Sequence, residues 1–350
     1  MATRSGVRAR GRPGSPRWCW RISYGSAKLA AMTLRILLVT GIVAALAISV
    51  MGRDTAADGA ASAVANVAVD IDSARLLTHL SVLAHDSMEG RGMGTDGAAR
   101  ARRYLVAELR RLGVEPLGER YEAPFDLGRR GTGVNLLGVV PGTAPAGVIV
   151  LSAHYDHDGV RSGEIYNGAD DNASGVAAVL EIARVLEAEP GRNTVVIALF
   201  DDEEAGLNGA RAFVAEPPLP LDGVLLNVNL DMVSRANGLL WGAGTHHTPA
   251  LRPVLEAVAA GAPLELRLGH DRPGAPEGDD WTSQSDHQAF HEQGIPFVYF
   301  GVEDHPDYHR PTDDFDRVDP GDFVRSARTI LLALKALDAA LPLSDPDALR

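Results

Sequence analysis

The fold class follows most directly from one apolar run, Thr194–Phe200, in which the six residues after the threonine carry no polar side chain. A run of this length, rich in β-branched residues, is typical of a strand buried on both faces of a sheet. Similar short runs are separated by segments with helical periodicity, the longest being Pro320–Leu341. This alternation predicts an α/β three-layer sandwich, with a mixed, mostly parallel twisted central sheet flanked by helices.

Composition divides the 350 residues into four parts. Residues 1–53 are predicted to be a basic segment with a signal peptide or membrane anchor, and residues 54–69 a linker rich in alanine and glycine. Residues 70–342 have the apolar content and periodicity of one large domain, and residues 343–350 are a C-terminal tail. Within the domain we expect strands at residues 134–140, 148–153, 194–200, 223–230, 264–268 and 296–300.

The first 53 residues contain nine lysine or arginine residues and no acidic residue, and residues 36–52 are apolar. These 17 apolar residues exceed most signal-peptide cores and fall slightly short of the ~20 that cross a bilayer. The pattern predicts an exported protein, which is secreted, periplasmic or anchored at the outer face of the cytoplasmic membrane through residues 36–52. Met1 and Met32 are both compatible start sites.

The rest of the chain holds 24 basic and 46 acidic residues. Such an acidic surface repels phosphate, so we exclude nucleic acid as a partner. Cys19, the one cysteine of the sequence, lies in the N-terminal segment. The domain therefore has no disulfide and no thiolate, and any metal ion must be bound through nitrogen and oxygen.

Histidine and acidic side chains follow the predicted strands. His154, Glu203 and Asp231 each lie within three residues of the end of a different strand, and Glu204 adjoins Glu203. Because the carboxyl ends of parallel strands meet at one edge of a sheet, we expect these side chains to converge. A single pair of adjacent acidic residues usually lies in a solvated loop, but several acidic and histidine residues at strand ends favour a metal site.

Six short motifs together carry a family resemblance. They are His154-Tyr155-Asp156, residues 168–175 (Gly-Ala-Asp-Asp-Asn-Ala-Ser-Gly), Glu203-Glu204, residues 229–232 (Asn-Leu-Asp-Met), Ser285-Asp286-His287 and Tyr308-His309. In this order and spacing the chain resembles the di-zinc exopeptidases of the M28 peptidase family, which include bacterial secreted aminopeptidases. The resemblance extends from Leu76 to Leu334 and implies a twisted, mixed sheet of eight strands between helices.

The resemblance also implies a ligand set for two zinc ions. His154 and Asp231 would hold one ion, Glu204 and His309 the other, and Asp170 would bridge both. The two ions would activate a shared water and polarise the substrate carbonyl. Cobalt and manganese are alternatives, because nitrogen and oxygen ligands accept several divalent ions.

Supporting roles follow from the same resemblance. Glu203 would be the general base that moves the proton of the water to the departing amine. Asp156 is expected to orient His154, with a surface acid as the alternative. Tyr308 would either hydrogen-bond the tetrahedral intermediate or pack against its neighbours. Asp171 would follow the bridging ligand through a cis peptide bond.

Further positions near these motifs have less defined roles. His157 and His305 either support the ligands or lie exposed, and His287 is expected to brace the pocket wall. His246 and His247 are expected at the surface. The stretches expected to set side-chain preference are Asp280-Trp281 and Gly242–Thr248.

The function implied is metal-dependent exopeptidase activity, specifically removal of N-terminal residues from peptides with a free N-terminus. Alternatives on the same fold are a carboxypeptidase or dipeptidase, and a glutaminyl-cyclase-like enzyme. The cyclase branch typically replaces the second acid of the pair Asp170-Asp171, which is retained here. A catalytically inactive binding module is the third alternative, and the presence of Glu203 with all five expected ligands argues against it.

Overall fold

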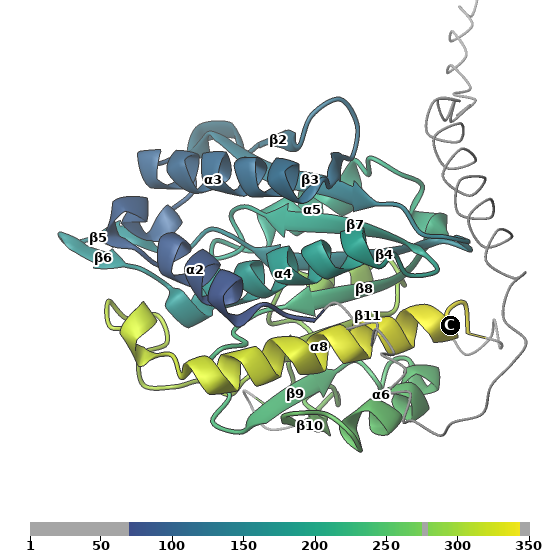
Figure 1. The fold of residues 1–350 in the computed structure, drawn as a ribbon. Helices are drawn as coiled ribbons and strands as arrows, with labels where there is room; N and C mark the ends of the chain where they lie inside the picture. The colour runs from purple at the N-terminus through teal and green to yellow at the C-terminus, as the bar shows by residue number, and fades with distance from the viewer. Residues whose placement is uncertain (1–69, 275–278, 344–350) are drawn as a thin grey trace, which may run out of the picture. The chain divides into compact units, whose positions relative to one another are not determined.

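A nine-stranded sheet runs through the part of the chain that the computed structural model describes, residues 70–274 and 279–343 (Figure 1). The order across the sheet is β1-β3-β7-β4-β8-β11-β9-β10, and β2 pairs with β3. The strands are β1 Glu115–Pro116, β2 Glu122–Asp126, β3 Thr132–Val140, β4 Val148–His154, β7 Thr194–Phe200, β8 Val224–Leu230, β9 Leu239–Ala243, β10 Glu265–Leu268 and β11 Phe297–Gly301.

The N-terminal segment with its apolar stretch 36–52, the linker and residues 344–350 of the tail lie outside the described residues. Among the helices that are described, none combines the length and apolar character needed to span a bilayer. The predictions of a signal peptide or anchor therefore remain predictions.

The central strands β7, β4, β8 and β11 are parallel neighbours, while β3 and β9 join this group through antiparallel pairings with β7 and β11. β1 and β2 share one edge of β3, since β2 pairs at residues 132–136 and β1 at Gly138 and Val139. Nine strands thus occupy eight positions across the sheet, where eight strands were expected. The predicted mixed, twisted sheet is confirmed.

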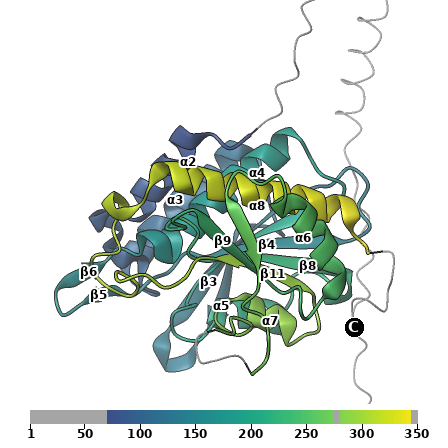
Figure 2. The same cartoon turned by 90° about the horizontal axis from the view of Figure 1, so that it is seen from below.

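Helices cover both faces of the sheet (Figure 2). On one face lie α2 Ser73–Leu83, α3 Asp96–Leu112, α4 Gly175–Ala188, α6 Arg252–Ala259 and α8 Pro320–Ala340, and on the other lie α5 Asn208–Ala215 and α7 His287–His291. Strand residues alternate between the two cores. In β4, Ile149 and Leu151 belong to the core beneath the first group of helices, and Val150 to the core beneath α5 and α7. The predicted three-layer arrangement is confirmed.

Several short strands were not predicted from the sequence, among them β1 and β2 at one edge of the sheet. β9 is five residues long and contains Gly242, and the hairpin of β5 (Gly159–Arg161) and β6 (Glu164–Tyr166) has strands of three residues. Segments this short show no periodic pattern of their own, so pairing with neighbouring strands decides them. The hairpin lies within residues 158–167, which the sequence analysis leaves without an element.

A buried contact attaches α8 to the start of β7. The Asp338 carboxylate accepts hydrogen bonds from the backbone N–H groups of Arg192 (2.5 Å) and Asn193 (2.8 Å) and from Nδ2 of Asn193 (3.0 Å). Asp338→Ala removes the two oxygens that accept these three hydrogen bonds and leaves the donors of Asn193 buried, so we expect the free energy of unfolding to fall by about 2–4 kcal/mol in urea titration. Asp316→Ala, at a side chain that is 83% exposed, is the control and should change it by less than about 0.5 kcal/mol. Equal effects of the two substitutions would contradict this account.

Candidate active site

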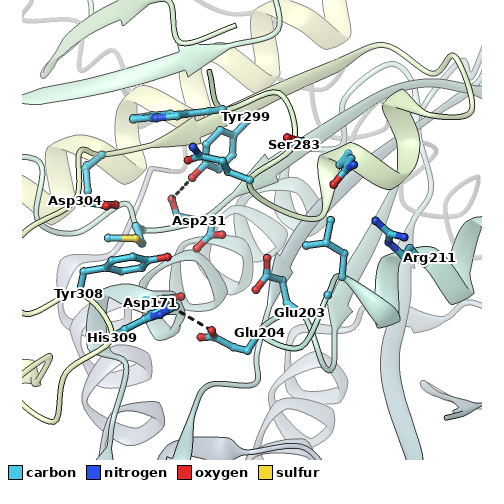
Figure 3. Close-up of a pocket in the computed structure, with 17 residues that line it drawn as sticks. Asp171, Glu203, Glu204, Arg211, Asp231, Ser283, Tyr299, Asp304, Tyr308 and His309 are labelled. Carbon is cyan, nitrogen blue, oxygen red and sulfur yellow. Dashed lines mark hydrogen bonds and ion pairs between the residues drawn. The ribbon is translucent and has the colours of Figure 1, made fainter. Parts of the chain in front are cut away.

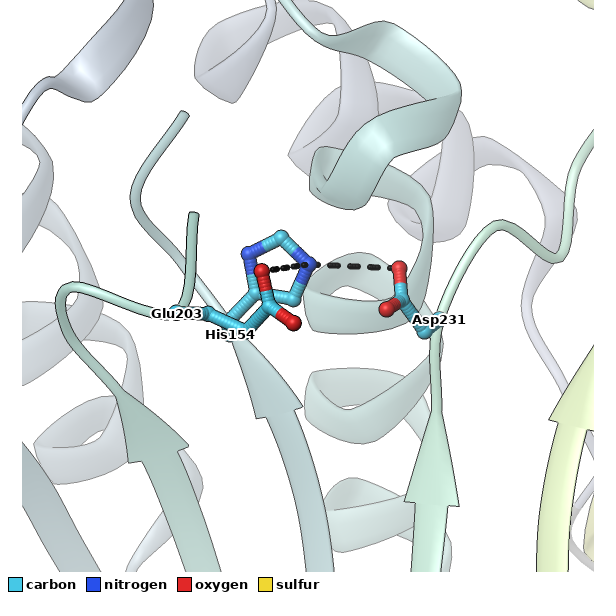
Figure 4. A group of neighbouring side chains, drawn as sticks. All are labelled: His154, Glu203 and Asp231. Carbon is cyan, nitrogen blue, oxygen red and sulfur yellow. Dashed lines mark hydrogen bonds and ion pairs between the residues drawn. The ribbon is translucent and has the colours of Figure 1, made fainter. Parts of the chain in front are cut away.

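Three predicted site residues meet beyond the ends of neighbouring strands β7, β4 and β8 (Figure 4). His154 is the last residue of β4, Asp231 directly follows β8, and Glu203 lies three residues beyond β7. The Nε2 atom of His154 is 3.2 Å from Oδ1 of Asp231 and 4.0 Å from Oε2 of Glu203. The convergence that the strand ends predict is therefore observed.

A second group of predicted site residues, His309, Glu204 and Asp171, lies beside the first. Nε2 of His309 is 3.2 Å from Oε2 of Glu204 and 3.1 Å from Oδ2 of Asp171. The other carboxylate oxygen of Asp171, Oδ1, is 3.3 Å from Nε2 of His154. Asp171 thus lies between the two histidines, with one oxygen toward each.

Asp170 does not occupy the position that the bridging prediction requires. Its Oδ1 accepts hydrogen bonds of 2.7 Å from both the backbone N–H and the hydroxyl of Ser234, and its Oδ2 is 3.3 Å from Nε2 of His305. The carboxylate is therefore turned toward the loop after β8 and away from His154 and His309. The residue between the two histidines is Asp171, one position later.

In residues 170–174, every second side chain is hydrogen-bonded to the end of β8 or to the residues that follow it. Nδ2 of Asn172 donates to the carbonyl of Leu230 (2.8 Å), and the Ser174 hydroxyl accepts the N–H of Val233 (3.0 Å). Together with Asp170 these contacts anchor every second residue, so the intervening Asp171 faces the opposite side. Asp313 accepts the backbone N–H groups of Asp170 and Asp171 at 3.0–3.1 Å.

Glycine residues flank residues 169–174 at both ends, because neither position has room for a Cβ atom. Gly168 has φ +53°, and a Cβ there would lie 1.9 Å from the carbonyl oxygen of Asp171. A Cβ on Gly175 would lie 2.3 Å from Oδ1 of Asn172. The cis peptide bond joins Asp171 to Asn172, so the predicted bond between Asp170 and Asp171 was wrong by one residue.

The two adjacent glutamates have opposite electrostatic environments. Burial raises the pKa of Glu203 well above its ordinary value, and Asp231 acts in the same direction although His154 opposes it. Burial and Asp171 also act to raise the pKa of Glu204, but His157 and His309 outweigh them and lower it to about 2. Glu203 therefore holds a proton far more readily than its neighbour.

Asp156 and Tyr308 both lie at this site. The buried carboxylate of Asp156 accepts the backbone N–H of Glu203 (3.1 Å), and its Oδ1 is 3.6 Å from Nδ1 of His154. Asp156 is thus in contact with the two strand ends at once, which excludes the surface alternative. The Tyr308 ring packs 4.0 Å from the ring of His309 and lines the adjacent cavity.

The remaining histidines differ in their surroundings. His157 is buried, with Nδ1 2.5 Å from Oε1 of Glu204, so the exposed alternative is wrong for it. The Nε2 atom of His287 donates a hydrogen bond to the carbonyl of Trp281 (2.8 Å), and the ring stacks on Tyr299 at 4.6 Å. Because Trp281 and Tyr299 line the cavity, His287 braces its wall as predicted. His246 is exposed, as expected, while the neighbouring His247 is only partly exposed.

A cavity of about 490 Å³ opens beside the convergent residues (Figure 3). Its described lining includes the acids Asp171, Glu203, Glu204, Asp231 and Asp304. Trp281 belongs to the lining, as the sequence analysis expected. Residues 242–248 are not among its described lining: Gly242 and Ala243 belong to β9, and the backbone N–H groups of Gly244 and His246 donate to Asp271. Their influence on side-chain preference stays a prediction.

Arg91 is a component of the site that the sequence analysis did not detect. Its side chain is fully buried and donates to four backbone carbonyls, those of Leu83 (2.8 Å), Tyr155 (2.8 Å), Asn167 (2.6 Å) and Gly168 (2.9 Å). These bonds join the loops after β4 and before Asp171. A single arginine whose partners are backbone groups 8 to 77 residues away leaves no pattern in the sequence.

The donor set fits divalent metal ions. Two groups each bring three ligand atoms within 4.8 Å of one another: His154, Glu203 and Asp231, and His154, Asp171 and Glu204. No lysine or arginine of the described residues forms an ion pair with these four carboxylates, whose ion-pair partners there are histidines. Buried carboxylates need a compensating cation, and zinc accepts imidazole and carboxylate ligands.

The sequence profile of Peptidase family M28 matches residues 135–334, which is more than half of the chain. The chain belongs to this family. Aminopeptidase YwaD of Bacillus subtilis is 31% identical over 188 residues, which cover 49% of this chain and 37% of YwaD. For three curated relatives the matched share of their own length is 36% to 54%.

Solved structures share the M28 fold. The zinc aminopeptidase BSAP of Bacillus subtilis has a TM-score of 0.61 at 17% identity, covering 76% of this chain and 95% of BSAP. The glutaminyl cyclase of Porphyromonas gingivalis has a TM-score of 0.62 at 21% identity, covering 75% of this chain and 98% of the cyclase. Similarity at this level of identity establishes the shared fold.

Burial lowers the pKa of Arg91 to about 10, with nearby carboxylates such as Asp156 opposing the shift, so the side chain stays charged at neutral pH. Arg91→Met removes this buried cation and its donors and leaves buried carbonyls without partners. We expect the free energy of unfolding to fall by about 3 kcal/mol or more in urea titration. Arg91→Lys keeps the charge but cannot supply the planar fork of donors, so it should also destabilise. The exposed Arg103→Met is the control, and a loss as large as that of Arg91→Met would contradict the assignment.

Proposed function

We propose that this protein is a metal-dependent aminopeptidase, which hydrolyses N-terminal residues of peptides. The observation that carries the proposal is the arrangement of His154 with Asp231 and His309 with Glu204, each pair at 3.2 Å, with Asp171 between them. Membership of the M28 family and the aminopeptidase name of YwaD support the reaction class. The adjoining cavity is of a size typical for small ligands.

We propose two zinc ions as the resident metals. His154 and Asp231 would hold one and Glu204 and His309 the other, and Asp171 would bridge them in place of Asp170. When bound, such ions lower the pKa of water and polarise a substrate carbonyl.

The chain's own residues would then move the proton and hold the geometry. Glu203 accepts a proton from the attacking water and delivers it to the departing amine. Asp156 positions both the base Glu203 and the proposed metal ligand His154, because it contacts the backbone of the first and the imidazole of the second. Tyr308 is placed at the cavity wall, where its hydroxyl can donate to the oxygen that becomes negative.

An aminopeptidase is favoured over a carboxypeptidase by the aminopeptidase name of the relative YwaD. Of the five carboxylates that line the cavity, bound metal ions would offset the charge of their ligands, while Asp304 lies outside the proposed metal site and can attract the cationic α-amine of a free N-terminus. Cyclisation of N-terminal glutamine is a further outcome of the substrate panel below. We also propose export of the protein, on the basis of the basic and apolar pattern of residues 1–53.

Glu203→Gln tests the proposed base. The substitution keeps the size of the side chain but removes its basicity, so we expect kcat for leucine p-nitroanilide to fall roughly 100- to 10,000-fold. Zinc content after dialysis, measured by mass spectrometry, should stay at two ions per chain, whereas loss of one ion would make Glu203 a ligand. Glu216→Gln, at an exposed position at the end of α5, is the control and should retain wild-type kcat. A zinc-loaded wild type that releases no amino acid from any aminoacyl substrate or N-terminal glutamine peptide would refute the proposal.

The bridging assignment is tested by comparing neighbouring acids. Asp171→Asn removes a charged oxygen from between His154 and His309, so we expect fewer than two zinc ions per chain and loss of activity. Asp170→Asn replaces an acceptor of the Ser234 hydrogen bonds, so we expect lower thermal stability with two zinc ions retained. The reverse outcome, in which only Asp170→Asn loses zinc, would restore the ligand set expected from the sequence.

A further inference from the structure

Arg211 is the one arginine or lysine among the described residues that line the cavity. It belongs to α5, the helix that follows Glu203 and Glu204. Figure 3 shows Arg211 and His309 at opposite ends of the cavity, with Glu203 between them. Apart from His309, every other charged residue in the lining is acidic.

Among the described residues Arg211 forms no ion pair. No carboxylate of those residues lies within 4.0 Å of its guanidinium, and the residue is exposed. Other arginines near the site differ in this respect, since Arg235 is 2.5 Å from Asp307 and Arg130 is 2.6 Å from Asp202. Because Arg211 has no ion-pair partner in the described part of the chain, its guanidinium at the end of the cavity is available to a ligand.

The chemistry around Arg211 suits an anion with two oxygens. The described lining also contains Ser283 and Gln284, whose hydroxyl and amide groups are neutral hydrogen-bond donors. The planar guanidinium matches a carboxylate through two parallel hydrogen bonds, and the concave wall strengthens its field relative to open solvent. The lining further includes Met232, Tyr299 and Tyr308, which offer apolar and aromatic surface.

We propose that Arg211 binds a carboxylate of the substrate, so that the enzyme prefers peptides with a negative charge close to the scissile bond. This inference rests on the proposed peptidase function. The carboxylate has three sources in a peptide: the side chain of the first residue, the side chain of the second residue, and the C-terminus of a dipeptide.

Three matched substrate pairs distinguish these sources with the full-length, zinc-loaded protein. The pairs are Asp-Ala-Ala-amide with Asn-Ala-Ala-amide, Ala-Asp-Ala-amide with Ala-Asn-Ala-amide, and Ala-Ala with Ala-Ala-amide. Within each pair the substrates differ in charge and hardly in shape. We expect kcat/KM for the charged member of one pair to exceed that of its neutral partner about tenfold, mainly through KM.

Variants of Arg211 decide whether this residue causes the preference. In Arg211→Gln the ratio of the two kcat/KM values should fall to about one, and in Arg211→Glu below one. Arg103→Gln removes the same charge from an exposed position on α3 and should keep the wild-type ratio. Equal kcat/KM within all three pairs, or a preference that persists in Arg211→Gln, would overturn the inference while leaving the peptidase function intact. A wild type that hydrolyses leucine p-nitroanilide but none of the six peptides would also overturn the inference alone, whereas one that hydrolyses neither would refute the proposed function.

Discussion

Four carboxylates, those of Asp171, Glu203, Glu204 and Asp231, are held together in a largely buried place with only histidines as ion-pair partners among the described residues. Charges of one sign repel each other strongly where water is excluded. A fold can hold such a group only if rigid elements place each acid and a cation compensates their charge. The rest of the domain can be understood as meeting these two requirements.

The central strands meet the first requirement. β7, β4 and β8 are parallel and adjacent, so their carboxyl ends deliver Glu203, His154 and Asp231 to one edge. Residues buried on both faces of these strands hold that edge rigid. The loops are held by Arg91, which binds four carbonyls, and by Asp313, which accepts two backbone N–H groups. The histidines and the donor chemistry are consistent with metal ions as the compensating charge.

The local pattern of apolar residues and glycines was enough to predict the main helices and strands. The apolar run Thr194–Phe200 is a strand buried on both faces, and α3 ends at Gly113, whose φ of +86° is the left-handed conformation expected after a helix. Elements that depend on their neighbours were missed, including β9 and the β5–β6 hairpin. Arg91 was missed for a related reason, because its partners are backbone carbonyls and any sequence supplies those.

The sequence by itself determined that acids and histidines gather at strand ends, since strand positions and chain direction already imply a common edge. It could not determine which acid of the pair Asp170-Asp171 faces that edge. Adjacent side chains point to different sides of an extended segment, and the choice depends on what lies on each side. Ser234 binds Asp170, Asn172 binds the end of β8, and Asp171 is left facing His154 and His309. Except for the contact of Asp171 with His154, these contacts join residues about 60 positions or more apart, so only the tertiary structure could decide the orientation.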